Sequence, residues 1–268
     1  MEVVLAPFPV RRDVDGNLAR MRSALDASGP GDLVVFPEGA LSGYPDDLSG
    51  LAGLAPDRLR QALDELHVLA SSRGVHVVLG TLWPEGDGWV NAAAHLGPAG
   101  ERQWYQKVNL ATHERGVLTA GPGLPVFHIG GVLVGIQICR ELRYPEQWRW
   151  LSLQGAKVLI HVTHAVGAPQ ALPVWRSHLV SRAAENQRFV VSVNTADERQ
   201  MCPSMVVGPR GDVRVELTGA RAETARASLD VAEVSDWYIS QARTDLLALA
   251  PPKDAPTRGG EVPGAQVP

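Results

Sequence analysis

The sequence predicts an α/β protein with mixed β-sheets. Short β-branched apolar runs alternate with amphipathic helical segments, an order in which helices cover the faces of a sheet. Glycine-containing turns in the middle and toward the end of the chain are typical of hairpins, which join antiparallel strands. Antiparallel pairing should therefore be combined with the parallel pairing that alternating strands and helices favour.

Six apolar, β-branched runs are expected to be strands, and they are Val3–Ala6, Leu33–Phe36, Val75–Leu82, Val132–Ile138, Val158–His161 and Phe189–Val193. Two helices are expected between the first three of them, because apolar residues recur there at helical spacing. These residues are Leu18, Met21 and Leu25 in the first helix and Leu59, Leu63, Leu66 and Ala70 in the second.

Three hairpins are expected. The turns Gly-Asp-Gly before Trp89 and Gly-Pro-Ala-Gly before Glu101 each carry the glycines that reverse a chain. A third hairpin should join Ser204–Val207 to Val213–Leu217 through the turn Gly208-Pro209-Arg210-Gly211-Asp212.

Length and composition indicate one domain that acts on a small molecule. The 268 residues are 45% hydrophobic, enough for a sizeable core, and we expect the domain to span residues 1–249. Residues 250–268 are rich in Pro and Gly, which predicts a flexible tail. The formal net charge of -4 does not favour binding to nucleic acid or to an anionic membrane, which attract positively charged proteins.

The remaining composition favours a cytoplasmic location. The N-terminus begins with a strand-like run and lacks the charged, apolar and small-residue zones of a secretory signal. No apolar stretch has the length needed to span a bilayer. The two cysteines, Cys139 and Cys202, form no disulfide framework and suit a reducing compartment.

Three segments carry residues suited to chemistry. In the first, the apolar strand at Leu33–Phe36 runs through Pro37 into Glu38, and a loop containing Tyr44 follows. In the second, Lys107 lies among apolar residues and Glu114 comes shortly afterwards. Taken singly, a loop glutamate is usually solvated and a strand lysine usually reaches solvent.

The third segment places Cys139 at the end of an apolar strand. A helix is expected from Pro145, since proline is favoured in a first helical turn. Such a strand-turn-helix unit exposes the sulfur and points the following backbone N–H, here that of Arg140, toward a carbonyl under attack. A lone cysteine in this context is more often an inert buried residue.

Together the segments resemble the nitrilase or carbon–nitrogen hydrolase superfamily. The motifs Phe-Pro-Glu with Gly-Tyr-Pro, Tyr-Gln-Lys, and Gly-Ile-Gln-Ile-Cys before Arg-Tyr-Pro-Glu occur in that order, and the resemblance extends from the first strand to about Val215. It implies a four-layer α-β-β-α sandwich and a Glu, Lys and Cys triad. No metal or other cofactor is implied.

The resemblance implies a role for each matched residue. Glu38 would be the general base, Cys139 the nucleophile that forms a thioester, and Lys107 the group that stabilises the tetrahedral oxyanion with the Arg140 backbone N–H. Glu114 would be a second, assisting glutamate, although an ordinary loop acid is the alternative. Tyr44, Arg140 and His164 are expected to contact substrate.

Two departures from the family pattern bear on the site. Glu141 stands where relatives often have aspartate, and the stretch from His161 to Ala165 replaces a more usual Pro- or Ser-containing pattern. His161 and His164 also suggest a metal site, but we reject it because no nearby Cys or carboxylate completes a ligand set. Cys202 has no matching motif and is interpreted as incidental.

The leading function hypothesis is an amidase that acts on a small primary amide, with ω-amides of dicarboxylic acids as an example. An N-carbamoyl amine or amino acid amidohydrolase is the alternative. A nitrilase is less favoured because Arg140 follows Cys139 where nitrilases tend to carry Trp and Glu. Other classes left open are a non-catalytic binding protein and an acyltransferase.

We further expect a homodimer or larger homo-oligomer, because the family pairs its units through helices. The contacts are expected at Glu146–Leu153 and Trp175–Glu185, with Trp148, Trp150 and Trp175 as candidate anchors.

Overall fold

The structure, a computed structural model, describes residues 1–45 and 47–249. Its strands form two six-stranded sheets. The first sheet has the order β12 (Ala225–Ser228), β1 (Glu2–Leu5), β2 (Leu33–Val35), β3 (His76–Glu85), β4 (Gly88–Leu96) and β5 (Arg102–Gln106). The second has the order β11 (Val213–Leu217), β10 (Ser204–Val207), β9 (Phe189–Asn194), β8 (Val158–Thr163), β7 (Val132–Ile138) and β6 (Val126–Ile129).

Both sheets are mixed. The strands β1, β2 and β3 are parallel in the first sheet, as are β7, β8 and β9 in the second, and the outer strands pair antiparallel. All six predicted strands and all three predicted hairpins are present, with strand ends that differ by no more than a few residues. The prediction of mixed sheets is therefore confirmed.

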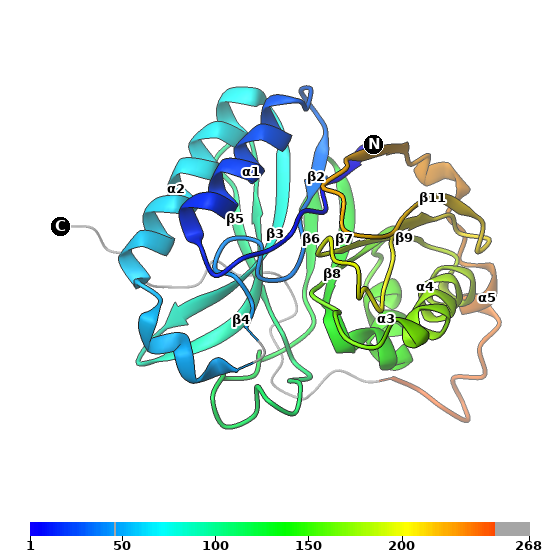
Figure 1. Ribbon diagram of the computed structural model, residues 1–268. Helices are drawn as coiled ribbons and strands as arrows, with labels where there is room; N and C mark the ends of the chain where they lie inside the picture. The colour runs from blue at the N-terminus through cyan, green and yellow to red at the C-terminus, as the bar shows by residue number, and fades with distance from the viewer. Residues whose placement is uncertain (46, 250–268) are drawn as a thin grey trace.

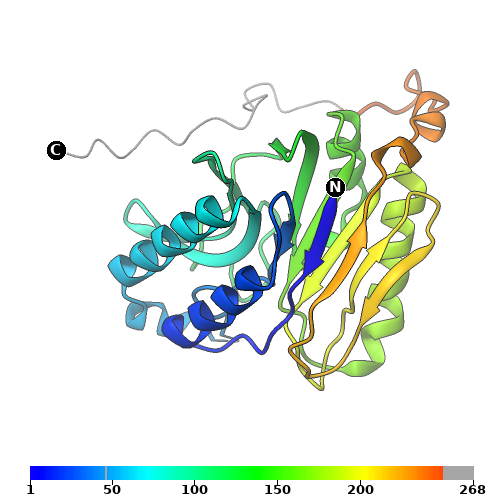
Figure 2. The ribbon, with the colours of Figure 1, turned by 90° about the horizontal axis from the view of Figure 1, so that it is seen from above.

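Helices cover the outer face of each sheet. The first sheet carries α1 (Val14–Asp26) and α2 (Pro56–Arg73), and the second carries α3 (Pro145–Leu153) and α4 (Leu172–Asn186) (Figures 1 and 2). A short helix, α5 (Trp237–Ser240), lies near the end of the described chain. The layers run helix, sheet, sheet, helix, so the expected four-layer α-β-β-α sandwich is confirmed.

The alternation of side chains along each strand builds this sandwich. In β1, Val3 and Leu5 belong to the core between the two sheets, whereas Val4 packs with the α1 and α2 helices. In β8, Val158, Ile160 and Val162 face the central core, as the two-residue period of a strand requires. Both faces of each central strand are thus buried, which explains their nearly continuous apolar sequences.

Three short 3-10 helices, Leu48–Gly53, Pro169–Ala171 and Val231–Glu233, lie in connections, and a fourth spans Cys139–Arg143. None of the helices in the described part of the chain combines the length and apolarity needed to cross a bilayer. The predicted tail, residues 250–268, lies outside the described residues, and the predicted domain limits stay a prediction.

The proposed tryptophan anchors need a correction. Trp148 is fully buried and Trp175 is only 5% exposed, because both pack between α3, α4 and the second sheet. They are part of this subunit's own core and are not free to anchor a partner. Trp150 is partly exposed, and the exposed apolar residues of these helices are instead Leu153 and Val174.

Candidate active site

Glu38 is fixed in place by the strands next to it. It lies three residues beyond β2, and Phe36 N–H donates to the Val78 carbonyl at 2.8 Å while Gly80 N–H donates to the Pro37 carbonyl at 3.0 Å. A Cβ on Gly80 would come within 2.4 Å of the Glu38 Cα, so only glycine lets β3 pass this close. The Glu38 backbone is therefore held rigidly at the end of the sheet.

The Glu38 carboxylate is fully buried and accepts three hydrogen bonds. Its Oε1 accepts from Lys107 Nζ at 3.1 Å and from Asn91 Nδ2 at 2.7 Å. Its Oε2 accepts from the backbone N–H of His164 at 2.8 Å, which reaches it from the second sheet. Both carboxylate oxygens thus have partners, as a buried charge requires.

Lys107 is the cation of the site. It directly follows β5, is fully buried, and its Nζ lies 3.1 Å from Glu38 and 3.0 Å from Glu114. Burial alone would lower the pKa of this ammonium, but the carboxylates of Glu38 and Glu114 raise it above its ordinary value. Lys107 is therefore charged at neutral pH and does not reach solvent.

Glu114 is not an exposed loop acid, because it is fully buried beside Lys107. Its Oε1 accepts from Tyr44 Oη at 2.7 Å, from Asn91 Nδ2 at 2.6 Å and from Lys107, and its Oε2 accepts from Ala111 N–H at 2.5 Å. Burial opposes ionisation, but Lys107 and these donors lower the pKa of Glu114 below its ordinary value. The structure therefore groups Glu114 with Glu38 and Lys107.

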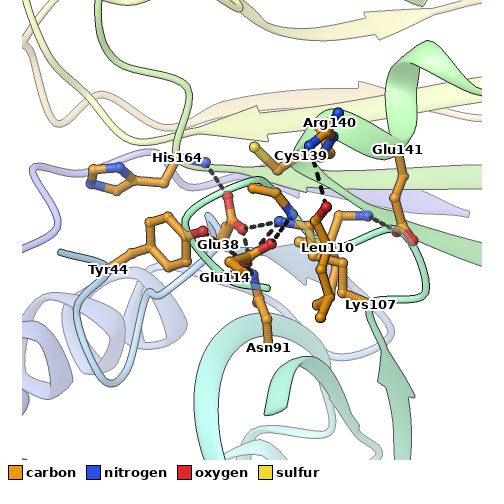
Figure 3. Close-up of polar contacts among 12 residues, drawn as sticks. Glu38, Tyr44, Asn91, Lys107, Leu110, Glu114, Cys139, Arg140, Glu141 and His164 are labelled. Carbon is orange, nitrogen blue, oxygen red and sulfur yellow. Dashed lines mark hydrogen bonds and ion pairs between the residues drawn. The ribbon is translucent and has the colours of Figure 1, made fainter. Parts of the chain in front are cut away.

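Cys139 enters the cluster from the second sheet (Figure 3). It follows β7 directly and begins the 3-10 helix Cys139–Arg143, and α3 starts at Pro145 as expected. Its φ of 54° is left-handed, a conformation that non-glycine residues seldom adopt and that occurs at strained turns in functional sites. The residue is partly accessible, unlike the buried Cys202.

The electrostatic surroundings keep the Cys139 thiol protonated at neutral pH. Burial and the neighbouring Glu38 raise its pKa to about 12, although Lys107 and Thr163 act in the opposite direction. A protonated sulfur is a weak nucleophile, so a reaction at Cys139 needs a base that removes the proton as the bond forms.

Glu141 ties the Lys107 loop to the Cys139 turn. Its carboxylate is fully buried and accepts from the backbone N–H groups of Val108 and Asn109 at 2.8 and 3.0 Å and from that of Ile138 at 2.8 Å. Tyr105 Oη adds a further donor, 2.8 and 2.7 Å from the two oxygens. Burial raises the pKa of Glu141 to about 7, opposed by the Asn109 and Ile138 donors. The carboxylate thus bridges the two sheets.

The three residues expected to contact substrate lie around the cluster. Tyr44 and His164 line a cavity of about 530 Å³, and the centroids of their rings are 5.6 Å apart. Both also contact the buried carboxylates, Tyr44 through its hydroxyl and His164 through its backbone N–H. Arg140 directly follows Cys139, and its guanidinium donates to the Leu110 carbonyl at 3.2 Å. The cavity therefore opens beside the cluster, at Tyr44 and His164.

Charged residues also line this cavity, and they are Arg11, Asp197, Glu198 and Arg199. In the part of the chain that the structure describes, no three His, Cys, Asp or Glu residues group together as metal ligands.

Asn91 is a site residue that the motifs did not reveal. Its amide nitrogen donates to both Glu38 and Glu114, and its backbone carbonyl accepts from Lys107 N–H at 2.8 Å. The available signal was a single amide between the apolar residues Trp89–Val90 and Ala92–Ala94 of β4. An amide at such a position must find buried partners, so it marks a polar cluster.

Comparisons with known proteins identify the family. The carbon–nitrogen hydrolase family model matches residues 4–239. A nitrilase of Pyrococcus abyssi is 30% identical over 78% of this chain and 80% of its own, and an (R)-stereoselective amidase of Pseudomonas sp. is 34% identical over 76% of each. This chain belongs to the carbon–nitrogen hydrolase family.

A solved structure agrees with this assignment. A cysteine-to-alanine variant of the amidase from Nesterenkonia sp. AN1, in complex with butyramide, superposes with a TM-score of 0.78 at 25% identity, covering 92% of this chain and 95% of that one. The resemblance drawn from the motifs is confirmed, and so is the expectation of an enzyme that hydrolyses carbon–nitrogen bonds.

Proposed function

We propose that this protein is an amidase that cleaves a small primary amide through a thioester on Cys139. The observation that carries the proposal is a fully buried ammonium, Lys107, held between Glu38 and Glu114 beside a cysteine at a strained turn. A buried cation with two fixed carboxylates is a preorganised environment for charge that develops during a reaction.

In the acylation half, Glu38 takes the Sγ proton as Cys139 attacks the amide carbon. The carbonyl oxygen becomes an oxyanion, stabilised by the Lys107 ammonium and the Arg140 backbone N–H. When the oxyanion collapses, the C–N bond breaks and the leaving nitrogen takes the proton from Glu38. Ammonia departs and an acyl thioester remains on Cys139.

In the deacylation half, Glu38 removes a proton from water as the oxygen attacks the thioester carbon. The second tetrahedral oxyanion uses the same two donors. Its collapse breaks the C–S bond, the proton on Glu38 returns to the sulfur, and a carboxylic acid leaves. Glu114 keeps Lys107 charged and in position through its ion pair at 3.0 Å.

The cavity gives the substrate a path toward the cluster, because Tyr44 and His164 line it, whereas Cys139, Glu38 and Lys107 are not among its lining residues. Its volume is about 530 Å³, and Tyr44 and His164, which line it, also hydrogen-bond the catalytic carboxylates. The butyramide complex of the Nesterenkonia amidase makes short aliphatic amides the first choice. A nitrile is disfavoured by the Cys139-Arg140-Glu141 context, and an N-carbamoyl compound remains the alternative because it would use the same triad.

A panel of substrates matched in shape tests the substrate class. We expect kcat/KM to be highest for butyramide and the ω-amide succinamate, lower for propylurea as an N-carbamoyl amine, and lowest for butyronitrile. Ammonia release is the common measurement, and carbon dioxide release separates the carbamoyl reaction from the amide reaction. A kcat/KM for butyronitrile above that for butyramide would assign the protein to the nitrilases instead.

We also infer a cytoplasmic homodimer or larger homo-oligomer. The two cysteines are free, and Leu153 and Val174 leave apolar surface exposed on α3 and α4. Light scattering of the purified protein tests the assembly, and a monomer at micromolar concentration would contradict it. Fractionation of the source cells tests the location.

A further inference from the structure

His161 is a buried titratable residue that the proposed reaction does not use. It lies on β8, is fully buried, and stands outside the group formed by Glu38, Lys107 and Glu114. Its Nε2 lies 2.8 Å from the backbone carbonyl oxygen of Cys139, and its Nδ1 lies 2.9 Å from Ser192 Oγ. Ser192 is its register partner on the neighbouring strand β9.

These contacts determine where the proton of the ring lies. A carbonyl oxygen only accepts hydrogen bonds, so Nε2 must carry the proton and donate it to the Cys139 carbonyl. Burial lowers the pKa of His161 to about 4, so the ring is neutral at neutral pH and Nδ1 carries no proton. Nδ1 therefore accepts from the Ser192 hydroxyl, which holds the ring in this tautomer.

The carbonyl that His161 contacts belongs to the same peptide group as the Arg140 N–H. A peptide group is planar, so a hydrogen bond that fixes the direction of its oxygen also fixes the direction of its N–H. Donation to the oxygen also polarises the group and strengthens the N–H as a donor. Because Cys139 has a φ of 54°, this peptide group lies in a strained turn that needs support from its surroundings.

We propose that His161 is a positioning residue that holds the peptide group between Cys139 and Arg140 with its N–H directed at the tetrahedral oxyanion. The inference rests on the proposed function, because it assumes that an oxyanion forms at Cys139. Burying a polar side chain inside β8 costs stability, whereas burying an apolar side chain there would not. The hydrogen bond to the turn at Cys139 explains why a histidine occupies this position.

Replacement of His161 by leucine removes the donor, whereas glutamine places an amide N–H near the position of Nε2. We expect His161→Leu to lower kcat for butyramide by about tenfold to a hundredfold, less than or similar to the loss of a direct oxyanion donor, with little change in KM. His161→Gln should recover most of this loss. His95→Leu is the control. It removes another fully buried histidine, which lies on β4 and far from Cys139 in the chain, and it should keep kcat.

Alkylation of Cys139 by methyl iodide, a reagent without an amide or carbonyl group, separates positioning of the oxyanion donor from a general structural role. This displacement builds no oxyanion, so its rate in His161→Leu should stay within about twofold of the wild-type rate while kcat falls. An unchanged kcat, or an alkylation rate that falls in proportion to kcat, would overturn the proposal.

Ser192→Ala provides a second route should the leucine variant not fold. Without the Ser192 hydroxyl, nothing holds the His161 ring in the tautomer with its proton on Nε2. We therefore expect kcat to fall severalfold while the alkylation rate of Cys139 stays unchanged. An unaffected kcat would again overturn the proposal. Turnover by the wild type and its loss in Cys139→Ala test the proposed function separately. A normal wild type with an unaffected His161→Leu therefore counts against His161 alone.

Discussion

Replacement of Cys139 by alanine is expected to reduce amide hydrolysis to the background rate. The thioester cannot form without the sulfur, and the remaining donors stabilise an oxyanion that no longer arises. The fold should survive, because only one atom is lost at a partly accessible turn whose φ of 54° suits alanine no worse than cysteine. Ammonia release and thermal unfolding, measured on the same preparation, check both parts.

Cys202→Ala is the matched control, because the chain has two cysteines and Cys202 is fully buried away from solvent. Its Sγ lies 3.8 Å from Ser192 Oγ and 3.6 Å from the Pro203 carbonyl, so it makes only weak polar contacts. We expect this variant to lose a little stability and to keep turnover. Activity retained in Cys139→Ala and lost in Cys202→Ala would move the nucleophile to the other residue.

Lys107→Ala is expected to lower kcat by about a hundredfold or more, the scale of loss when an oxyanion donor is removed. Stability should also fall, because Glu38 and Glu114 would be left buried without their cation. Breaking a buried ion pair in this way costs about 3–5 kcal/mol in the free energy of unfolding. Steady-state kinetics and chemical denaturation measure the two effects.

Two further variants separate charge from volume. Lys107→Met keeps most of the side-chain volume and should lose as much kcat as Lys107→Ala, since the ammonium is what stabilises the oxyanion. Lys157→Ala removes a partly exposed lysine elsewhere and should leave kcat unchanged. A Lys107→Met variant that folds and retains more than about half of the wild-type kcat would contradict the role of Lys107.

The site residues that lie at the ends of strands could be predicted from the sequence. Glu38, Lys107 and Cys139 follow β2, β5 and β7 within three residues. Apolar runs precede Glu38 and Cys139, whereas β5 is largely polar, so Lys107 was identified from the Tyr-Gln-Lys motif of the family resemblance. The hairpins could be predicted for a similar reason, because their glycine-rich turns are local signals. The four-layer arrangement came from the family resemblance, since no local pattern specifies how two sheets pack.

The remaining site residues act through contacts between distant parts of the chain. Asn91 touches Glu38 and Glu114, which are 53 and 23 residues away, and no local motif encodes such a meeting. The sequence showed Glu141 only as a glutamate where relatives often have aspartate. In the structure, its longer side chain reaches from the Cys139 turn to the backbone that follows Lys107. Trp148 was misjudged because an aromatic residue on a helix suits a subunit interface and a core equally well.

The central claim is that the acyl group of the substrate becomes covalently bound to Cys139. Mass spectrometry of acid-quenched enzyme tests it directly, and a Glu38→Gln variant helps because an amide cannot activate the hydrolytic water. With butyramide, the account predicts a butyryl thioester on the peptide that contains Cys139, and no such adduct in Cys139→Ala. Turnover of butyramide without any adduct on Cys139, at a rate unchanged by alkylation of that cysteine, would contradict the account.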